Sequence, residues 1–95
     1  MKPDTNQLTK IHAQEIGVMV ENFGPLNLNT RLLVKLSATL ISQPMDEIKD
    51  QITYCLIAGI TPSEIYQTIF IITDTIGLTK SLKALTIAQD ALNEL

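Results

Sequence analysis

The chain has 95 residues, enough for one domain that buries about 60 to 68% of the surface exposed by its unfolded form. Its net charge is −3 and its seven basic residues are scattered, so no basic patch for nucleic acid is expected. No apolar stretch is long enough to cross a bilayer, the N-terminal sequence lacks the apolar region of a signal peptide, and a single cysteine excludes an internal disulfide. These features favour a cytoplasmic protein that binds neither nucleic acid nor membrane.

The first two predicted helices are separated by a glycine and a proline. Over about residues 6–22 the apolar side chains fall mostly on one helical face, and Gly24-Pro25 ends that pattern. A second apolar stripe recurs at three- and four-residue steps over 30–42, behind asparagine and threonine residues that can cap a helix. The stripe of this second helix consists of Leu32, Leu33, Leu36, Leu40 and Ile41.

The third helix is predicted over about 45–58. Pro44 ends the second helix but can open the next one, whose first turn carries Asp46 and Glu47 where the helix dipole favours acids. Gly59 ends the third helix, because glycine adopts a left-handed conformation without steric cost. The buried face is predicted to contain Ile48, Ile52, Cys55 and Leu56.

The residues that follow have the signature of a capped helix start. Thr61 is the predicted N-cap, Pro62 occupies the first helical position, and Glu64 completes a Thr-x-x-Glu capping box. Ile60 and Ile65 have the spacing of a hydrophobic staple across this start. The pattern predicts a sharp junction between the third and fourth helices.

The fourth helix is predicted over about 62–76, and Gly77 ends it. Its main stripe consists of Ile65, Ile69, Ile72 and Ile76. Tyr66, Phe70 and Ile71 add apolar surface outside this stripe, which indicates a helix covered on more than one side.

A fifth helix is predicted over about 80–93, with Thr79 or Ser81 as its cap. Its apolar face is predicted to contain Leu78, Leu82, Leu85, Ala88 and Leu92. No segment alternates with the period of a strand, and the connections are short. The sequence therefore predicts one all-α domain of about five helices over 1–95.

Three motifs occur in a recognisable order: Thr30-Arg31 at a helix start, Ala58-Gly59-Ile60-Thr61-x-x-Glu64-Ile65, and Gly77-x-x-x-x-Leu82-x-Ala84-Leu85. Over about residues 26–92, this order and spacing resemble the carboxymuconolactone decarboxylase and alkylhydroperoxidase D-like superfamily. The resemblance implies an all-α fold that assembles into homotrimers or homohexamers, with active sites at or near subunit contacts. Such assembly agrees with the surplus of apolar residues on the fourth helix.

The resemblance also implies where catalytic groups would lie. The peroxidase branch uses Cys-x-x-Cys-x-x-x-His and a glutamate one helix earlier, and the matching positions here hold Pro44, Glu47, Gln51 and Leu32. None of these side chains forms a thiolate, and glutamine does not titrate near neutral pH. The decarboxylase branch keeps the histidine, which Gln51 replaces. A degenerate active site is therefore expected, without a cofactor or metal.

Four residues are candidates for lining a pocket: Gln51, Cys55, His12 and Asp74. His12 is either half of a titrating pair with Glu15 or a histidine satisfied in a core or interface. Cys55 either lines the pocket beside Gln51 or is a small buried hydrophobe. Asp74 is either at an exposed helix end or a polar group in a cavity.

Arg31 and Lys35 lie one turn apart on the second helix. Together they can bind an anionic ligand. In the alternative interpretation, Arg31 pairs with an acid across a subunit contact and Lys35 is simply solvated.

The main hypothesis is a homo-oligomeric family member that lacks the thiol peroxidase relay and acts as a binding or accessory module. Its partners would be further copies of itself and either a small-molecule ligand or a catalytically competent paralogue. One alternative is an enzyme of the decarboxylase or peroxide-reducing type that uses the pocket residues named above. The other is a plain helical interaction protein.

Overall fold

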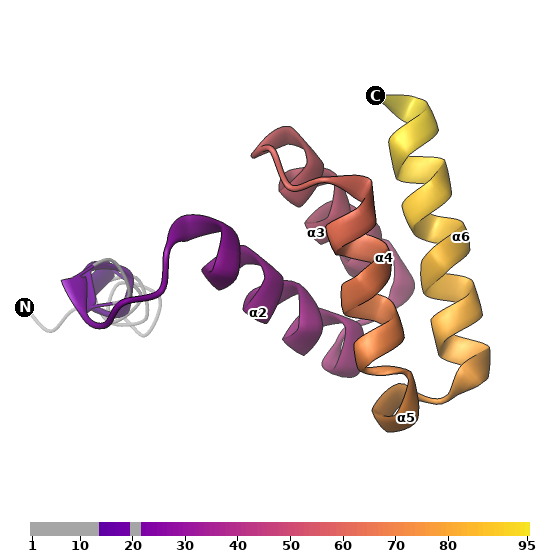
Figure 1. The fold of residues 1–95 in the computed structure, drawn as a ribbon, viewed down its shortest axis with the longest axis horizontal. Helices are drawn as coiled ribbons and strands as arrows, with labels where there is room; N and C mark the ends of the chain where they lie inside the picture. The colour runs from indigo at the N-terminus through magenta and orange to yellow at the C-terminus, as the bar shows by residue number, and fades with distance from the viewer. Residues whose placement is uncertain (1–13, 20–21) are drawn as a thin grey trace, which may run out of the picture.

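The computed structural model describes residues 14–19 and 22–95, and the regular elements within them are all helices. The named helices are α2 (Leu28–Ser42), α3 (Met45–Ile57), α4 (Pro62–Ile71), α5 (Thr73–Ile76) and α6 (Leu78–Glu94). Helices α2, α3, α4 and α6 surround one core, whereas residues 14–19 and 22–27, called the N-terminal arm below, lie beyond the start of α2 (Figure 1). The predicted all-α class is confirmed.

Helix α2 begins two residues earlier than predicted because Asn27 caps it. The Thr30 backbone N–H donates to Asn27 Oδ1 at 2.9 Å, which satisfies one of the free amides of the first turn. The buried side chains of α2 are Leu32, Leu36 and Leu40. Leu33 is only half-buried and Ile41 is exposed, so the predicted stripe was too wide.

Helix α3 starts directly after Pro44, which is its N-cap rather than its first helical residue. Asp46 and Glu47 occupy the first turn as predicted, and the buried side chains Ile48, Ile52 and Cys55 face the core. The helix ends at Ile57, one residue before the predicted end. Gly59 follows with a φ of +99°, a conformation that side chains with a Cβ rarely adopt.

The capping box at the start of α4 is confirmed. The Glu64 backbone N–H donates to Thr61 Oγ1 at 3.2 Å, and the Thr61 backbone N–H donates to Glu64 Oε1 at 3.0 Å. The amide and hydroxyl of Thr61 hold the pKa of the Glu64 carboxyl below its usual range. Ile60 and Ile65, the two predicted staple residues, are both buried in the core.

The single helix predicted over 62–76 is wrong, because the chain breaks at Ile72 into α4 and the short α5. The Thr73 hydroxyl donates to the Ile69 carbonyl at 2.8 Å and accepts from the Ser81 hydroxyl at 2.9 Å. Hydroxyl groups that bond back to the preceding turn favour a bend. The break is thus tied to α6 by a pair of polar side chains.

The start of the last helix also differs from the prediction. Helix α6 begins at Leu78, with Gly77 at its N-cap position, and neither Thr79 nor Ser81 caps it. Gly77 has a φ of +86° and both ends α5 and opens α6, so no connecting residues remain. Ser81 instead lies inside the helix, and its hydroxyl donates a hydrogen bond to the Thr73 hydroxyl.

The face of α6 that meets the core consists of small side chains. Its buried residues are Ser81, Ala84, Ala88 and Ala91. Of the predicted apolar face, Ala88 is buried and Leu85 packs against the core, whereas the prediction was wrong for Leu78 and Leu82, which are exposed over 66% and 54% of their surface. Small residues allow α6 to lie close to α3 and α4, and the leucines are left at the edge or outside.

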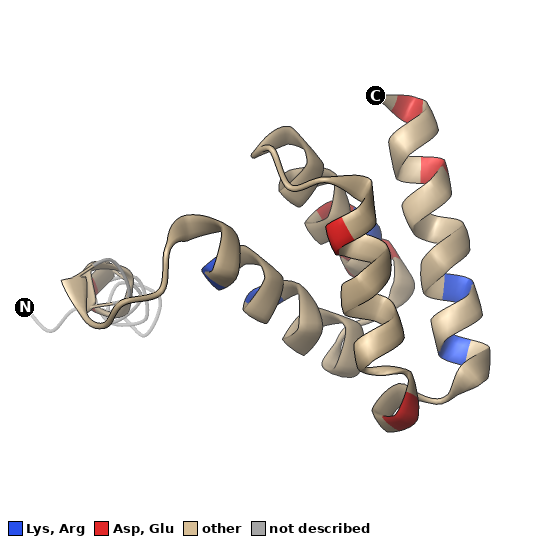
Figure 2. Ribbon diagram, in the orientation of Figure 1, with Lys and Arg blue, Asp and Glu red and all other residues tan. Residues whose placement is uncertain are grey.

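Charges on α6 run against the helix dipole. Lys80 and Lys83 lie in its N-terminal half and Asp90 and Glu94 in its C-terminal half (Figure 2). Lys49 on α3 offsets part of the unfavourable interaction between Glu94 and the helix dipole, since its Nζ lies 2.7 Å from Glu94 Oε1. This ion pair joins the N-terminal half of α3 to the C-terminal end of α6.

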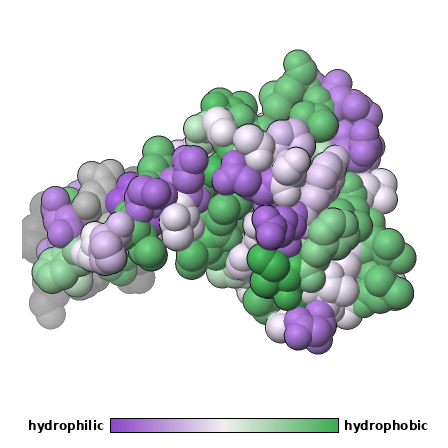
Figure 3. Space-filling view, in the orientation of Figure 1, coloured by the Kyte–Doolittle hydropathy of each residue, from purple (hydrophilic) through white to green (hydrophobic). Residues whose placement is uncertain are grey.

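Much apolar surface is exposed in the part of the chain that the structure describes (Figure 3). The exposed large apolar residues include Ile16, Val18, Met19, Phe23, Leu26, Leu28, Val34, Phe70, Ile71, Leu78 and Leu82. Phe70 and Ile71 lie on α4, so the expected cover on a second side of this helix is not supplied by residues 14–19 and 22–95. The helix predicted over 6–22 falls largely outside the described residues, although residues 14–19 are helical.

Candidate functional site

A groove runs between α2 and α3 and is called the α2–α3 groove below. Its volume is about 500 Å³. Its lining residues are Lys35, Thr39, Gln43, Glu47, Asp50, Gln51 and Tyr54. The groove is open to solvent, and side chains of both charge signs line it.

Helical spacing explains why these residues share one surface. On α3, Glu47, Gln51 and Tyr54 follow each other at four- and three-residue steps, so they lie one above the other on a single face. On α2, Lys35 and Thr39 are one turn apart. The short connection through Pro44 brings the two faces together.

Cys55 lies behind the groove, in the core. Its Sγ is 3.9 Å from Gln51 Nε2, which can donate to it, and 4.0 Å from the carbonyl oxygen of Leu32, to which the thiol can donate. Burial raises the pKa of the Cys55 thiol, and the Gln51 amide opposes this effect without reversing it. At neutral pH Cys55 is therefore a protonated, enclosed thiol rather than a nucleophile.

The four positions that the resemblance matches to catalytic residues do not converge on one point. Glu47 and Gln51 line the α2–α3 groove, with Glu47 exposed and Gln51 half-buried. Pro44 is exposed at the N-cap of α3 and is not part of the lining. Leu32 is buried, and it meets Cys55 through its carbonyl group.

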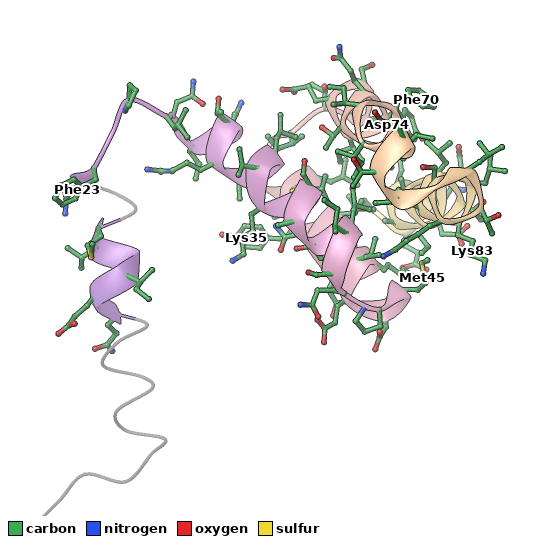
Figure 4. All side chains as sticks on the ribbon, turned by 90° about the horizontal axis from the view of Figure 1, so that it is seen from below. Phe23, Lys35, Met45, Phe70, Asp74 and Lys83 are labelled. Atoms are coloured by element: carbon green, nitrogen blue, oxygen red, sulfur yellow. The ribbon has the colours of Figure 1, made fainter. Side chains whose placement is uncertain are left out.

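The other candidate pocket residues are not brought to this groove. Asp74 lies on α5, exposed, beside Phe70 and away from Lys35 (Figure 4). Arg31 is half-buried one turn before Lys35 and is not among the lining residues. His12 lies outside the described residues.

Sequence analysis missed most of the groove. Asp50 and Tyr54 were not assigned to it, although the three-residue spacing of Asp50 from Glu47 and of Tyr54 from Gln51 is visible in the sequence. Thr39 on α2 carried no comparable signal. Only the packing of α2 against α3 shows which of their polar residues meet.

The groups in the groove are suited to binding. An ammonium group, two carboxylates, two amides, a hydroxyl and a phenol can hydrogen-bond a polar molecule, and none of these groups is a thiol or an imidazole. Within the described residues, no group of three or more histidine, cysteine or acidic side chains is positioned for a metal ion. No helix in the same part of the chain is both long enough and apolar enough to cross a membrane.

Comparisons of the sequence and structure with models of known protein families, with curated proteins and with solved structures give no match.

Proposed function

We propose that this chain is a homo-oligomeric helical module of the carboxymuconolactone decarboxylase and alkylhydroperoxidase D-like type that binds a small polar ligand or a partner protein. It does not use the thiol peroxidase relay of that family. In this proposal, trimers or hexamers form through the apolar surfaces that a single chain leaves exposed.

The chemical content of the α2–α3 groove is the observation that carries this proposal. The side chains that meet there, Lys35, Glu47, Asp50 and Gln51 among them, offer charge and hydrogen bonds but no thiolate and no imidazole. The single cysteine is buried behind the groove, where its pKa is raised. These features support binding over thiol-based turnover.

The exposed apolar side chains support the assembly part of the proposal. Phe70 and Ile71 are 62% and 68% exposed on one helix, and the N-terminal arm adds Phe23 at 76%. A small domain gains little stability by leaving such surface in water, and contiguous apolar surface favours association.

A turnover assay tests the chemical part. Purified protein is incubated with hydroperoxides plus a thiol reductant, and separately with carboxymuconolactone. We expect no turnover above background in either reaction. Turnover that Gln51→Ala or His12→Ala abolishes would instead support the enzyme alternative.

Restoring the relay tests the family alignment. The variant with Pro44→Cys, Glu47→Cys and Gln51→His is expected to gain peroxidase activity, because Pro44 is at a helix N-terminus, where a thiolate is stabilised. The control carries Pro44→Ser, Glu47→Ser and Gln51→His, which keeps the positions but removes both thiols. Activity above background that is equal in the two variants would contradict the alignment, because it would not come from the restored thiols.

A further inference from the structure

We propose that the α2–α3 groove binds a small zwitterion, with Glu47 and Asp50 holding its ammonium group and Lys35 holding its carboxylate. This inference rests on the ligand binding in the proposed function and adds the chemical class of the ligand. Two kinds of molecule have the required chemistry: an amino acid with several bonds between its charged groups, and a short peptide with free termini.

The packing of α2 against α3 determines how far apart these charges lie. The two helices run in roughly opposite directions, joined by a short connection (Figure 1). The Cys55 Sγ lies 4.0 Å from the carbonyl oxygen of Leu32, so these two residues are at about the same level along the helix pair. Three residues further along α2, Lys35 is level with about residue 52 of α3. It therefore lies about 7 Å beyond Glu47 and about 3 Å beyond Asp50 along the helix axis, at a rise of about 1.5 Å per residue.

The charges that line the groove do not neutralise one another. Among residues 14–19 and 22–95, Lys35, Glu47 and Asp50 form no ion pair and no side-chain hydrogen bond. The neighbouring Lys49 pairs with Glu94 on α6, outside the groove. A zwitterion can satisfy both signs of charge at once, whereas a ligand with one charge places it near a like charge on one of the two helices.

Neutral polar groups lie beside and between the charges. Gln51 is half-buried and points its Nε2 at Cys55 Sγ, 3.9 Å away, which leaves its Oε1 to accept a hydrogen bond. The Thr39 hydroxyl donates to the Lys35 carbonyl of its own helix at 2.9 Å, so its oxygen can still accept. Tyr54 is 60% exposed, and its phenol can donate to the carboxylate held by Lys35. The acceptors suit the N–H of a peptide group, which a methylene chain lacks.

The offset of the charges along the groove selects the length of the ligand. In an extended dipeptide the ammonium nitrogen and the carboxylate carbon lie about 6 Å apart, since one Cα–Cα step is about 3.8 Å and each end adds about one bond. This length matches the offset of about 3–7 Å between Lys35 and the two carboxylates. In an α-amino acid the two groups are about 2.5 Å apart, which falls short of the offset between Lys35 and Glu47.

Titrations with small probes of known charge test the assignment. Glycylglycine and 5-aminopentanoate have the same number of atoms between their charged groups, whereas pentylamine and pentanoate each carry one of the two charges. Binding to the full-length protein is measured at pH 7 and low salt by isothermal titration calorimetry. Both zwitterions are expected to bind about threefold to tenfold more tightly than either singly charged probe, because each exposed ion pair contributes modestly. Binding of both zwitterions no tighter than that of pentylamine or pentanoate would overturn the proposal.

The same titrations identify the source of the ligand. Tighter binding of glycylglycine than of 5-aminopentanoate points to a short peptide, since only a peptide group can donate to Thr39 and Gln51 from between the charges. The reverse order points to an amino acid. Glycine is expected to bind at least about threefold more weakly than glycylglycine. Equally tight binding of glycine would show that the zwitterion does not span the two helices, which also overturns the proposal.

Two charge-removing variants place the ligand in the groove. Lys35→Met is expected to weaken glycylglycine binding about threefold to tenfold without weakening that of pentylamine. Glu47→Gln is expected to weaken glycylglycine binding to a similar extent without weakening that of pentanoate.

Lys83→Met and Asp46→Asn are the matched controls, since both residues are exposed and lie outside the α2–α3 groove. Neither control is expected to change the affinity for glycylglycine. Equal losses in variants and controls would show an effect of net charge alone and would overturn the site. Circular dichroism checks that every variant remains helical.

Sedimentation of the same protein separates this inference from the proposed function. An oligomer that binds pentylamine or pentanoate as tightly as glycylglycine retains the proposed assembly and a polar ligand, and overturns only the zwitterion. A monomer that binds glycylglycine more tightly than the singly charged probes contradicts the proposed assembly and supports the groove assignment.

Discussion

At the scale of single residues, Cys55 illustrates how position decides chemistry. Its thiol is buried and its pKa is raised, so the folded chain disfavours the thiolate. We expect a thiol reagent at pH 8 to label the native protein about a hundredfold more slowly than the denatured chain. Because the unfolded chain loses this proton first, stability should fall as pH rises through the ordinary range of a thiol. Equally fast labelling of both states would contradict the burial.

The capping box predicts the opposite dependence of folding stability on pH. The pKa of Glu64 is lowered in the folded chain, so its contribution to stability is present above the unfolded pKa and is lost as pH falls through the folded pKa. We expect the stability difference between the unmodified chain and Glu64→Gln to shrink between pH 7 and pH 3 in denaturant titrations. Glutamine keeps the acceptor that the cap needs, so the comparison isolates the charge.

Glu47→Gln is the matched control for this titration. Glu47 holds the same third position in α3 that Glu64 holds in α4, but proline at the N-cap has no backbone N–H to donate to it. A Glu47→Gln chain should therefore follow the unmodified chain more closely on acidification. If the two variants behave alike, the bond between Glu64 and Thr61 is not the cause.

At the scale of elements, the two faces of α6 can be compared directly. Ala84 is fully buried against neighbouring helices, and Leu78 is 66% exposed. Ala84→Leu is expected to destabilise the chain by about 1–3 kcal/mol, since a well-packed site has no room for three more carbons. Leu78→Ala should change stability by less than about 0.5 kcal/mol. Urea unfolding measures the stability of both variants. A larger loss of stability for Leu78→Ala than for Ala84→Leu would indicate that Leu78, rather than Ala84, faces the core.

Element boundaries divide into local and non-local cases. The caps at Asn27 and Thr61 depend on residues three positions apart, so they are visible in the sequence. At the break, the Thr73 hydroxyl bonds the Ile69 carbonyl one turn earlier and also the Ser81 hydroxyl, eight residues on and in a different helix. The apolar period within 62–76 predicted one helix where two exist, because it contains no information about the contact with Ser81.

At the scale of the whole molecule, the uncovered apolar surface predicts how assembly responds to salt. Association driven by apolar burial should persist, or strengthen, from 0.1 M to about 1 M sodium sulfate, whereas ion pairs are screened. Sedimentation at micromolar protein concentration measures the oligomeric state across this range of salt concentration. Dissociation in high salt would mean that charges, rather than side chains such as Phe70 and Ile71, hold the copies together.

The sequence by itself determined the all-α class, the apolar stripes that contain the α2 and α3 core residues, and the junction from Gly59 to Ile65, because these depend on spacing and on neighbours within one turn. The tertiary structure decided which face of α6 is buried, since an alanine stripe and a leucine stripe have the same helical period. It also decided the groove, which α2 and α3 form only when packed. Helical periodicity defines faces on each helix separately, and only contact between helices determines which faces meet.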